Sequence, residues 1–112
     1  MEYFEIDPDL LGIEMPPSLK RFEARMFLCF NAYDGEFLGV EYSAEPKHLT
    51  ELRYLLRAKY KLEWDGLVAR SVNVGKVRIY VSTTSFIGGN LVLRYSDIQR
   101  VERARLNDAI GL

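Results

Sequence analysis

Few residues of this 112-residue chain could carry out chemistry by themselves, and the single histidine and the single cysteine come first. His48 falls at the expected start of a helix and has no nucleophile motif beside it. Cys29 lies in the apolar run 26–30, where a thiol is typically a small buried hydrophobe. With one His and one Cys, we expect neither an internal disulfide nor a structural zinc site.

Hydroxyl groups, glycines and carboxylates give no stronger sign of a reaction. The Ser-Thr-Thr-Ser run at 82–85 could offer hydroxyls to a ligand, but such a run is also typical of a strand end. The eight glycines match neither a dinucleotide-binding nor a P-loop spacing. Acidic residues gather near the N-terminus and at turn positions such as Asp34 and Asp65. We therefore predict no catalytic, cofactor-binding or metal-binding residues; a small hydrolase or transferase remains a third hypothesis, because a spatially assembled site is invisible in sequence.

Basic and aromatic residues alternate on one face of the helix expected at 47–61. Charge combined with base stacking is how proteins hold single-stranded nucleic acid, so this face is a candidate nucleic-acid interface. The other interpretation is a solvated face whose long side-chain stems cover apolar surface. The full basic patch would comprise Arg53, Tyr54, Arg57, Lys61, Arg100 and Arg103.

Charge is distributed unevenly along the chain although the net charge is only −1. Residues 1–51 hold 11 acids and 4 bases, whereas residues 52–112 hold 5 acids and 11 bases. Such asymmetry is typical of proteins with an anionic partner, but it also arises when two halves fold against each other and their charges compensate. A net charge near zero gives no long-range attraction to a polyanion, which favours the second explanation.

The sequence divides into an N-terminal arm at 1–20 and a single α+β domain at 21–112. Pro8, Pro16 and Pro17 interrupt regular structure in the arm. Because the arm mixes acids with large apolar side chains, we expect it either to pack on its own domain or to dock on another chain. The candidate partner-binding residues are Tyr3, Phe4, Leu10, Leu11 and Ile13.

Strand patterns flank a helix in the domain. Runs 22–33 and 36–43 surround an Asp-Gly turn, a strong hairpin signal. Leucines at helical spacing predict a helix over 47–61 with Leu52 and Leu56 in its buried stripe. Runs 67–74, 77–84 and 91–95 then predict a three-stranded meander, with turns at 75–76 and 86–90. The expected architecture is a small antiparallel sheet or a partly open barrel, with a central helix and a C-terminal helix.

The C-terminal stretch allows two interpretations. Ser96 and Gln99 fit a capping box, and Gly111 suits the end of a helix over the preceding residues. Such a helix would place Arg105 on its apolar side, as a candidate for a buried pair or a partner contact. The alternative is one turn followed by a strand through Arg105. We favour the helix.

The second half resembles bacterial pleckstrin-homology-like domains. The stretch Tyr-Lys-Leu-Glu-Trp-Asp-Gly-Leu at 60–67 precedes the meander, and Leu-Arg-Tyr-Ser-Asp-Ile-Gln-Arg-Val-Glu at 93–102 follows it. These resemble the "Tyr-x-Leu-x-x-x-Gly-Leu" and "Tyr-Ser-Asp-Ile-x-x-Val" motifs of such domains. The resemblance covers residues 60–112 and implies a non-catalytic adaptor or assembly module. The helix before the meander departs from that fold, which has strands there.

The sequence therefore favours a non-catalytic protein-binding module: a small bacterial or phage accessory subunit, adaptor or inhibitor/immunity-type protein that occupies a partner's surface. Its aromatic content of 12% suits an interface. The partner would be another protein or a neighbouring copy, with a nucleic acid as the alternative. The acidic N-terminus is unlike a signal peptide and no apolar run is long enough to span a membrane, so we expect a cytoplasmic protein.

Overall fold

A six-stranded antiparallel sheet organises the chain in the computed structural model, which describes residues 1–83 and 89–110. The sheet is open and does not close into a barrel, so the α+β prediction is confirmed in its sheet form. The strands are β1 (Glu2–Ile6), β2 (Arg25–Phe30), β3 (Phe37–Ala44), β4 (Arg70–Val74), β5 (Val77–Thr83) and β6 (Leu91–Asp97). The helices are α1 (Pro17–Arg21), the 3₁₀ turn η1 (Pro46–His48), α2 (Leu49–Tyr60) and α3 (Ile98–Ile110).

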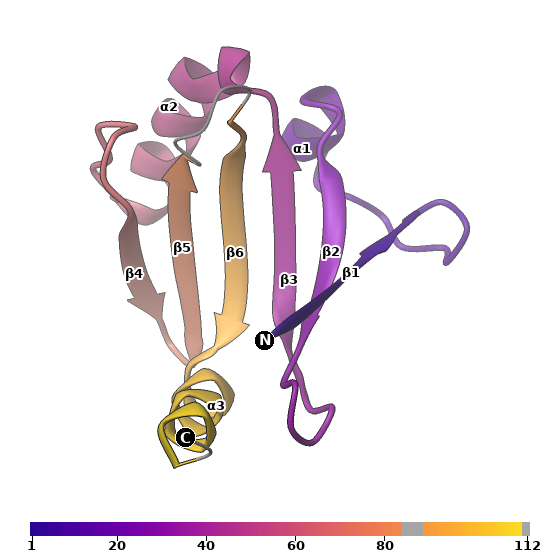
Figure 1. The fold of residues 1–112 in the computed structure, drawn as a ribbon. Helices are drawn as coiled ribbons and strands as arrows, with labels where there is room; N and C mark the ends of the chain where they lie inside the picture. Colours follow the sequence, from indigo (N-terminus) through magenta and orange to yellow (C-terminus); the bar gives the residue numbers. More distant parts are fainter. Residues whose placement is uncertain (84–88, 111–112) are drawn as a thin grey trace.

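The strand order β1-β2-β3-β6-β5-β4 joins the two predicted sheet pieces into one (Figure 1). The β2–β3 hairpin turns at Asp34 and Gly35, where Gly35 adopts a φ of +74°. The β4-β5-β6 meander supplies the other half. The pairing of β3 with β6, which runs from Gly39 opposite Ser96 to Ala44 opposite Leu91, connects the halves.

The main core lies between the sheet and the helices α1 and α2. Leu52 and Leu56 of α2 are buried as the helical spacing predicts, against side chains from β5 and β6. Trp64 closes one side of this core, and its indole N–H donates to the Val68 carbonyl at 2.8 Å. The main core comprises Leu19, Phe22, Leu52, Leu56, Leu62, Trp64, Ile79, Val81, Leu91 and Leu93.

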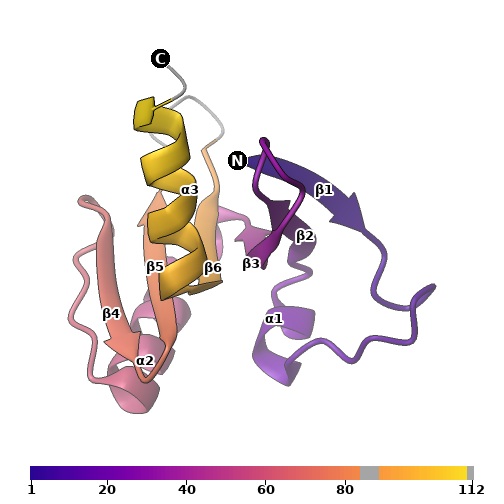
Figure 2. The ribbon, with the colours of Figure 1, turned by 90° about the horizontal axis from the view of Figure 1, so that it is seen from below.

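A second, smaller core anchors α3 at the opposite end of the sheet from α2 (Figure 1). Val101 and Ala104 of α3 pack there with Cys29 and Leu38. Seen along the sheet from below, α3 projects away from the side that carries α1 and α2 (Figure 2). The two helices predicted from the sequence, α2 and α3, therefore pack in two different core clusters.

The C-terminal helix is confirmed as far as Ile110, but its cap is one residue later than predicted. The Asp97 carboxylate accepts from the Arg100 backbone N–H at 2.9 Å, whereas Ser96 remains in β6 and is buried. Ser96 stays in the strand because it pairs with both Gly39 and Arg78. Arg105 is exposed and pairs with Glu102 at 3.6 Å, so it does not form a buried pair, and a partner contact stays a prediction.

Residues 1–21 contain a strand and a helix that were not predicted from the sequence. Residues 2–6 form β1, an edge strand, so this part of the arm packs on its own domain. Helix α1 continues past residue 20, the expected boundary of the arm. It ends at Arg21. Phe22 caps the helix, is buried in the core and is not part of a strand, and Glu23 then takes a φ of +54°. Strand β2 accordingly begins at Arg25.

The meander begins later than predicted because Asp65 holds a turn. Its carboxylate accepts from the backbone N–H groups of Leu67 and Val68, at 2.8 and 3.1 Å. These two residues are exposed and β4 starts only at Arg70. Residues 86–88 of the predicted turn at 86–90, residues 84–85 of the run at 82–85, and Gly111 fall outside the described residues.

Gly39 allows β3 and β6 to approach closely. A methyl group added there would overlap the Tyr95 carbonyl oxygen and lie 2.7 Å from the Ser96 Cα. We expect Gly39→Ala to lower the free energy of unfolding by about 3 kcal/mol, since backbone atoms would have to shift. Urea unfolding measures this. Gly75→Ala is the matched control: its φ is +59° but its Cβ has open space, so a loss of only about 1 kcal/mol is expected. Equal losses would refute the role of close approach.

Candidate functional site

The exposed N-terminal segment, defined here as residues 2–15, presents the five predicted partner-binding side chains to solvent. Their exposed fractions are 43% for Tyr3, 52% for Phe4, 84% for Leu10, 59% for Leu11 and 38% for Ile13. Single exposed hydrophobics are ordinary on a protein surface, but several on one short segment are typical of an interaction surface. The structure thus places all five on one segment, along β1 and the loop that follows it.

Strand β1 is an edge of the sheet. It pairs on one side with β2, with Phe4 opposite Leu28, and has no strand on its other side among the described residues. The Phe4 ring meets the Phe30 ring edge-on at 5.6 Å, and Glu5 pairs with Arg25, which holds the strand against β2. The outer backbone groups of such an edge can pair with an added strand.

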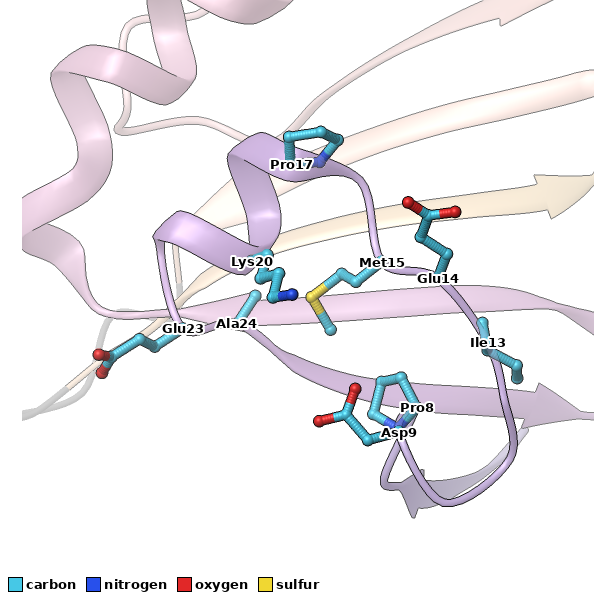
Figure 3. Close-up of a pocket in the computed structure, with 9 residues that line it drawn as sticks. All are labelled: Pro8, Asp9, Ile13, Glu14, Met15, Pro17, Lys20, Glu23 and Ala24. Carbon is cyan, nitrogen blue, oxygen red and sulfur yellow. The ribbon is translucent and has the colours of Figure 1, made fainter.

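The loop at 7–15 is ordered by local hydrogen bonds. The Leu11 and Ile13 backbone N–H groups both donate to the Pro8 carbonyl, at 3.2 and 2.9 Å, and Gly12 supplies a φ of +66°. A surface cavity of about 540 Å³ separates this loop from α1. Figure 3 shows the Met15 and Lys20 side chains pointing toward one another within it. Leu10 and Leu11 of this loop are exposed and lie outside the main core.

A half-buried charge cluster fastens β1 to the centre of the sheet. The Arg94 guanidinium donates twice to a Glu41 carboxylate oxygen, at 2.8 and 3.0 Å, and the two side chains are 23% and 15% exposed. The guanidinium also lies over the Tyr80 ring at 4.9 Å and the Tyr3 ring at 5.7 Å. Burial raises the pKa of Tyr3, although the nearby Arg94 opposes this shift. Tyr3 therefore anchors β1 as well as being exposed.

An apolar groove of about 290 Å³ between α1, α2 and β6 was missed in the sequence analysis. Leu19 and Phe22 line one wall, Leu55 and Ala58 the other, and Leu93 lies in β6 between them. Lys59 is the charged residue of this lining. The apolar face of α2 is wide enough to contact more than the main core. The opposite wall of the groove belongs to α1, a helix that was not predicted, so the sequence alone does not locate the groove.

The six residues of the predicted basic patch do not come together. Arg53 donates to the Trp64 carbonyl at 2.6 Å and Arg57 pairs with Glu63 at 2.9 Å. Tyr54 in α2 and Lys61 at the C-terminal end of this helix are exposed. Arg100 and Arg103 lie on α3 at the opposite end of the sheet (Figure 1) and pair with Glu36 at 3.4 and 3.3 Å. Four of the five basic side chains thus already have partners within the chain.

The histidine and the cysteine both pack against other side chains of the fold. The His48 ring stacks on the Phe22 ring with centroids 4.6 Å apart. Cys29 is fully buried, as predicted, and burial raises its thiol pKa to about 11. The described residues contain no group of three His, Cys, Asp or Glu side chains that could hold a metal ion. None of the helices in that part of the chain is long and apolar enough to cross a membrane.

Comparison of the chain with protein-family models, with curated proteins and with solved structures finds no match. The resemblance to pleckstrin-homology-like domains therefore stays a prediction.

The Glu41–Arg94 pair of the charge cluster leads to a prediction about stability. Glu41→Gln removes the negative charge that faces Arg94, so a half-buried guanidinium loses its compensating charge. We expect the free energy of unfolding to fall by about 2 kcal/mol, measured by urea unfolding. Glu45→Gln is the control, because Glu45 and Lys47 are both highly exposed and their pair at 3.3 Å should contribute little. Similar effects of both substitutions would contradict a structural role for the cluster.

The raised pKa of the Cys29 thiol leads us to predict a loss of stability at high pH. The folded protein keeps this thiol protonated up to about pH 11, whereas the unfolded chain ionises it from about pH 9. The unfolded state therefore binds fewer protons in this window, and the free energy of unfolding should fall by about 2 kcal/mol between these values. Urea unfolding at several pH values measures this.

The buried tyrosines contribute to the same trend above pH 10, because burial also raises the pKa of Tyr42 and Tyr95. Cys29→Ala isolates the contribution of the thiol. The variant should lose less stability than the natural protein between pH 9 and pH 10, and parallel curves over that range would contradict the assignment to Cys29.

Proposed function

We propose that this protein is a non-catalytic protein-binding module that docks on its partner through residues 3–13. The observation that carries the proposal is the exposure of five large apolar side chains on one edge strand and the loop that continues it. They lie beside a free strand edge, so backbone pairing and side-chain burial could act together. The proposed role is that of a small accessory subunit, adaptor or inhibitor/immunity-type protein, which acts by covering a partner's surface.

Charge on the segment restricts the kind of partner. Glu2, Asp7, Asp9 and Glu14 flank the apolar side chains, and residues 2–15 include no basic residue. A partner surface that is apolar at its centre and basic at its rim would complement this pattern. An acidic partner surface would be repelled by the carboxylates of this segment.

The nucleic-acid-binding alternative has less support. A polyanion site needs unpaired cations on one surface, but the described cations of the predicted patch lie at two ends of the molecule and are mostly paired with carboxylates or carbonyls. An electrophoretic assay at low salt tests it. Salt-sensitive binding of DNA or RNA that Arg57→Glu abolishes would overturn the proposed function.

Photo-crosslinking in the native cells tests the docking segment. A photoreactive phenylalanine analogue at Leu11 should form a discrete covalent adduct with one protein, and the same analogue at Leu67 should not. Leu67 is the matched control because it is also highly exposed, at 85%, but lies in the turn before β4.

The adduct should also depend on the neighbouring apolar side chains. Adding Leu10→Ser and Ile13→Ser to the Leu11 probe should reduce its yield at least about tenfold, since each buried leucine contributes the equivalent of about one decade of affinity or more. Circular dichroism would check that the variant is folded. Equal adducts from Leu11 and Leu67, or no loss in the variant, would refute docking through this segment.

A further inference from the structure

We infer that the apolar groove between α1 and α2 receives the loop at 7–15 of a second copy of this chain. The inference rests on the proposed function, because it names both the partner and the receiving surface for the same docking segment. Two features that belong to one chain, an exposed apolar loop and an exposed apolar groove, fit each other in chemistry and in charge.

The groove offers apolar side chains with a positive rim. Leu55, Leu93 and Phe22 line it, and none of its described lining residues is acidic. Lys59 lies at its side over the ring of Tyr60, at 5.4 Å, and exposed Lys61 follows at the end of α2. The groove would therefore accept a ligand that combines apolar side chains with carboxylates.

The loop has this combination. Leu10 and Leu11 project from it into solvent, and Asp7, Asp9 and Glu14 give it three negative charges without a basic residue. Its internal hydrogen bonds to the Pro8 carbonyl preorganise it before binding, which reduces the entropic cost of docking. A disordered acidic segment would lose more freedom on entering the same groove.

The position of the loop beside the groove suits a reciprocal exchange. The loop leads directly into Pro16, which itself lines the groove, and then into α1, which forms one wall. In a two-fold arrangement of two copies, each loop would enter the groove of the other copy. In such an isologous contact, each copy contributes both its loop and its groove, and the assembly is complete as a dimer.

Engineered disulfides test the contact between copies. Leu11→Cys and Ala58→Cys are made in separate chains and mixed under mild oxidation. We expect a disulfide-linked heterodimer at a yield at least about tenfold above that of the control mixture, which contains Leu11→Cys and Val74→Cys. Val74 is half exposed, like a groove position, but lies at the β4–β5 turn. Cys29 is buried in every variant and should not compete.

Sedimentation equilibrium of the natural protein gives an independent measurement. We expect a monomer–dimer equilibrium with a dissociation constant of about 1–100 µM, as for a small reciprocal interface. Ala58→Glu places a carboxylate at an exposed groove position and should shift the equilibrium to monomer at least about tenfold. Leu67→Glu, which adds the same charge outside the groove, should leave the equilibrium unchanged.

The outcomes separate this inference from the proposed function. A natural protein that stays monomeric at about 1 mM, or equal crosslinking of Ala58→Cys and Val74→Cys, would overturn the groove assignment. If the Leu11 photo-crosslinker nevertheless captured one foreign protein, the proposed function would stand without self-association. If neither self-association nor an adduct were found, both would fail.

Discussion

The pairing of β3 with β6 is the contact on which the rest of this structure depends. It joins the N-terminal hairpin to the C-terminal meander across more than fifty residues of chain, as the Glu41–Arg94 pair illustrates. An isolated hairpin is marginally stable in water, and neither half would bury enough apolar surface by itself. Gly39 permits the close approach of the two strands, and the core beneath α2 combines side chains from both halves.

The same pairing explains how charge is distributed over the folded chain. The acidic first half and the basic second half meet across the sheet and its ends, where Glu41 pairs with Arg94 and Glu36 faces Arg100 and Arg103. Compensation within the fold therefore accounts for several cations that could otherwise have served a polyanion. The loop at 7–15 keeps its acidic residues exposed, which gives this one segment a charge that a partner can recognise.

An open sheet leaves surfaces that a closed barrel would not. Strand β1 keeps a free edge, and α1 and α2 cover the main core while leaving an apolar groove between them. Both features lie near the N-terminal segment. The proposed docking of one copy on another uses the segment and the groove together.

Sequence alone determined the elements whose signals are local. The leucine spacing of α2, the Asp34–Gly35 hairpin turn and the alternation in β5 and β6 each depend on neighbours a few residues away, so they could be predicted, as could the burial of Cys29. The five apolar residues of the N-terminal segment could also be named as candidates, because their residue types are visible in the sequence, and the structure shows that they are exposed.

Tertiary structure decided what depends on distant partners. Strand β1 exists because β2 lies beside it, and Phe4 and Glu5 contact residues that are 20 or more positions away in the sequence. Ser96 stays in a strand because Gly39 and Arg78 flank it, which moves the helix cap to Asp97. The groove needs two helices and a strand, and the predicted basic patch separates because α2 and α3 pack at opposite ends of the sheet. No local pattern encodes these positions, since packing and strand pairing across the whole chain set them.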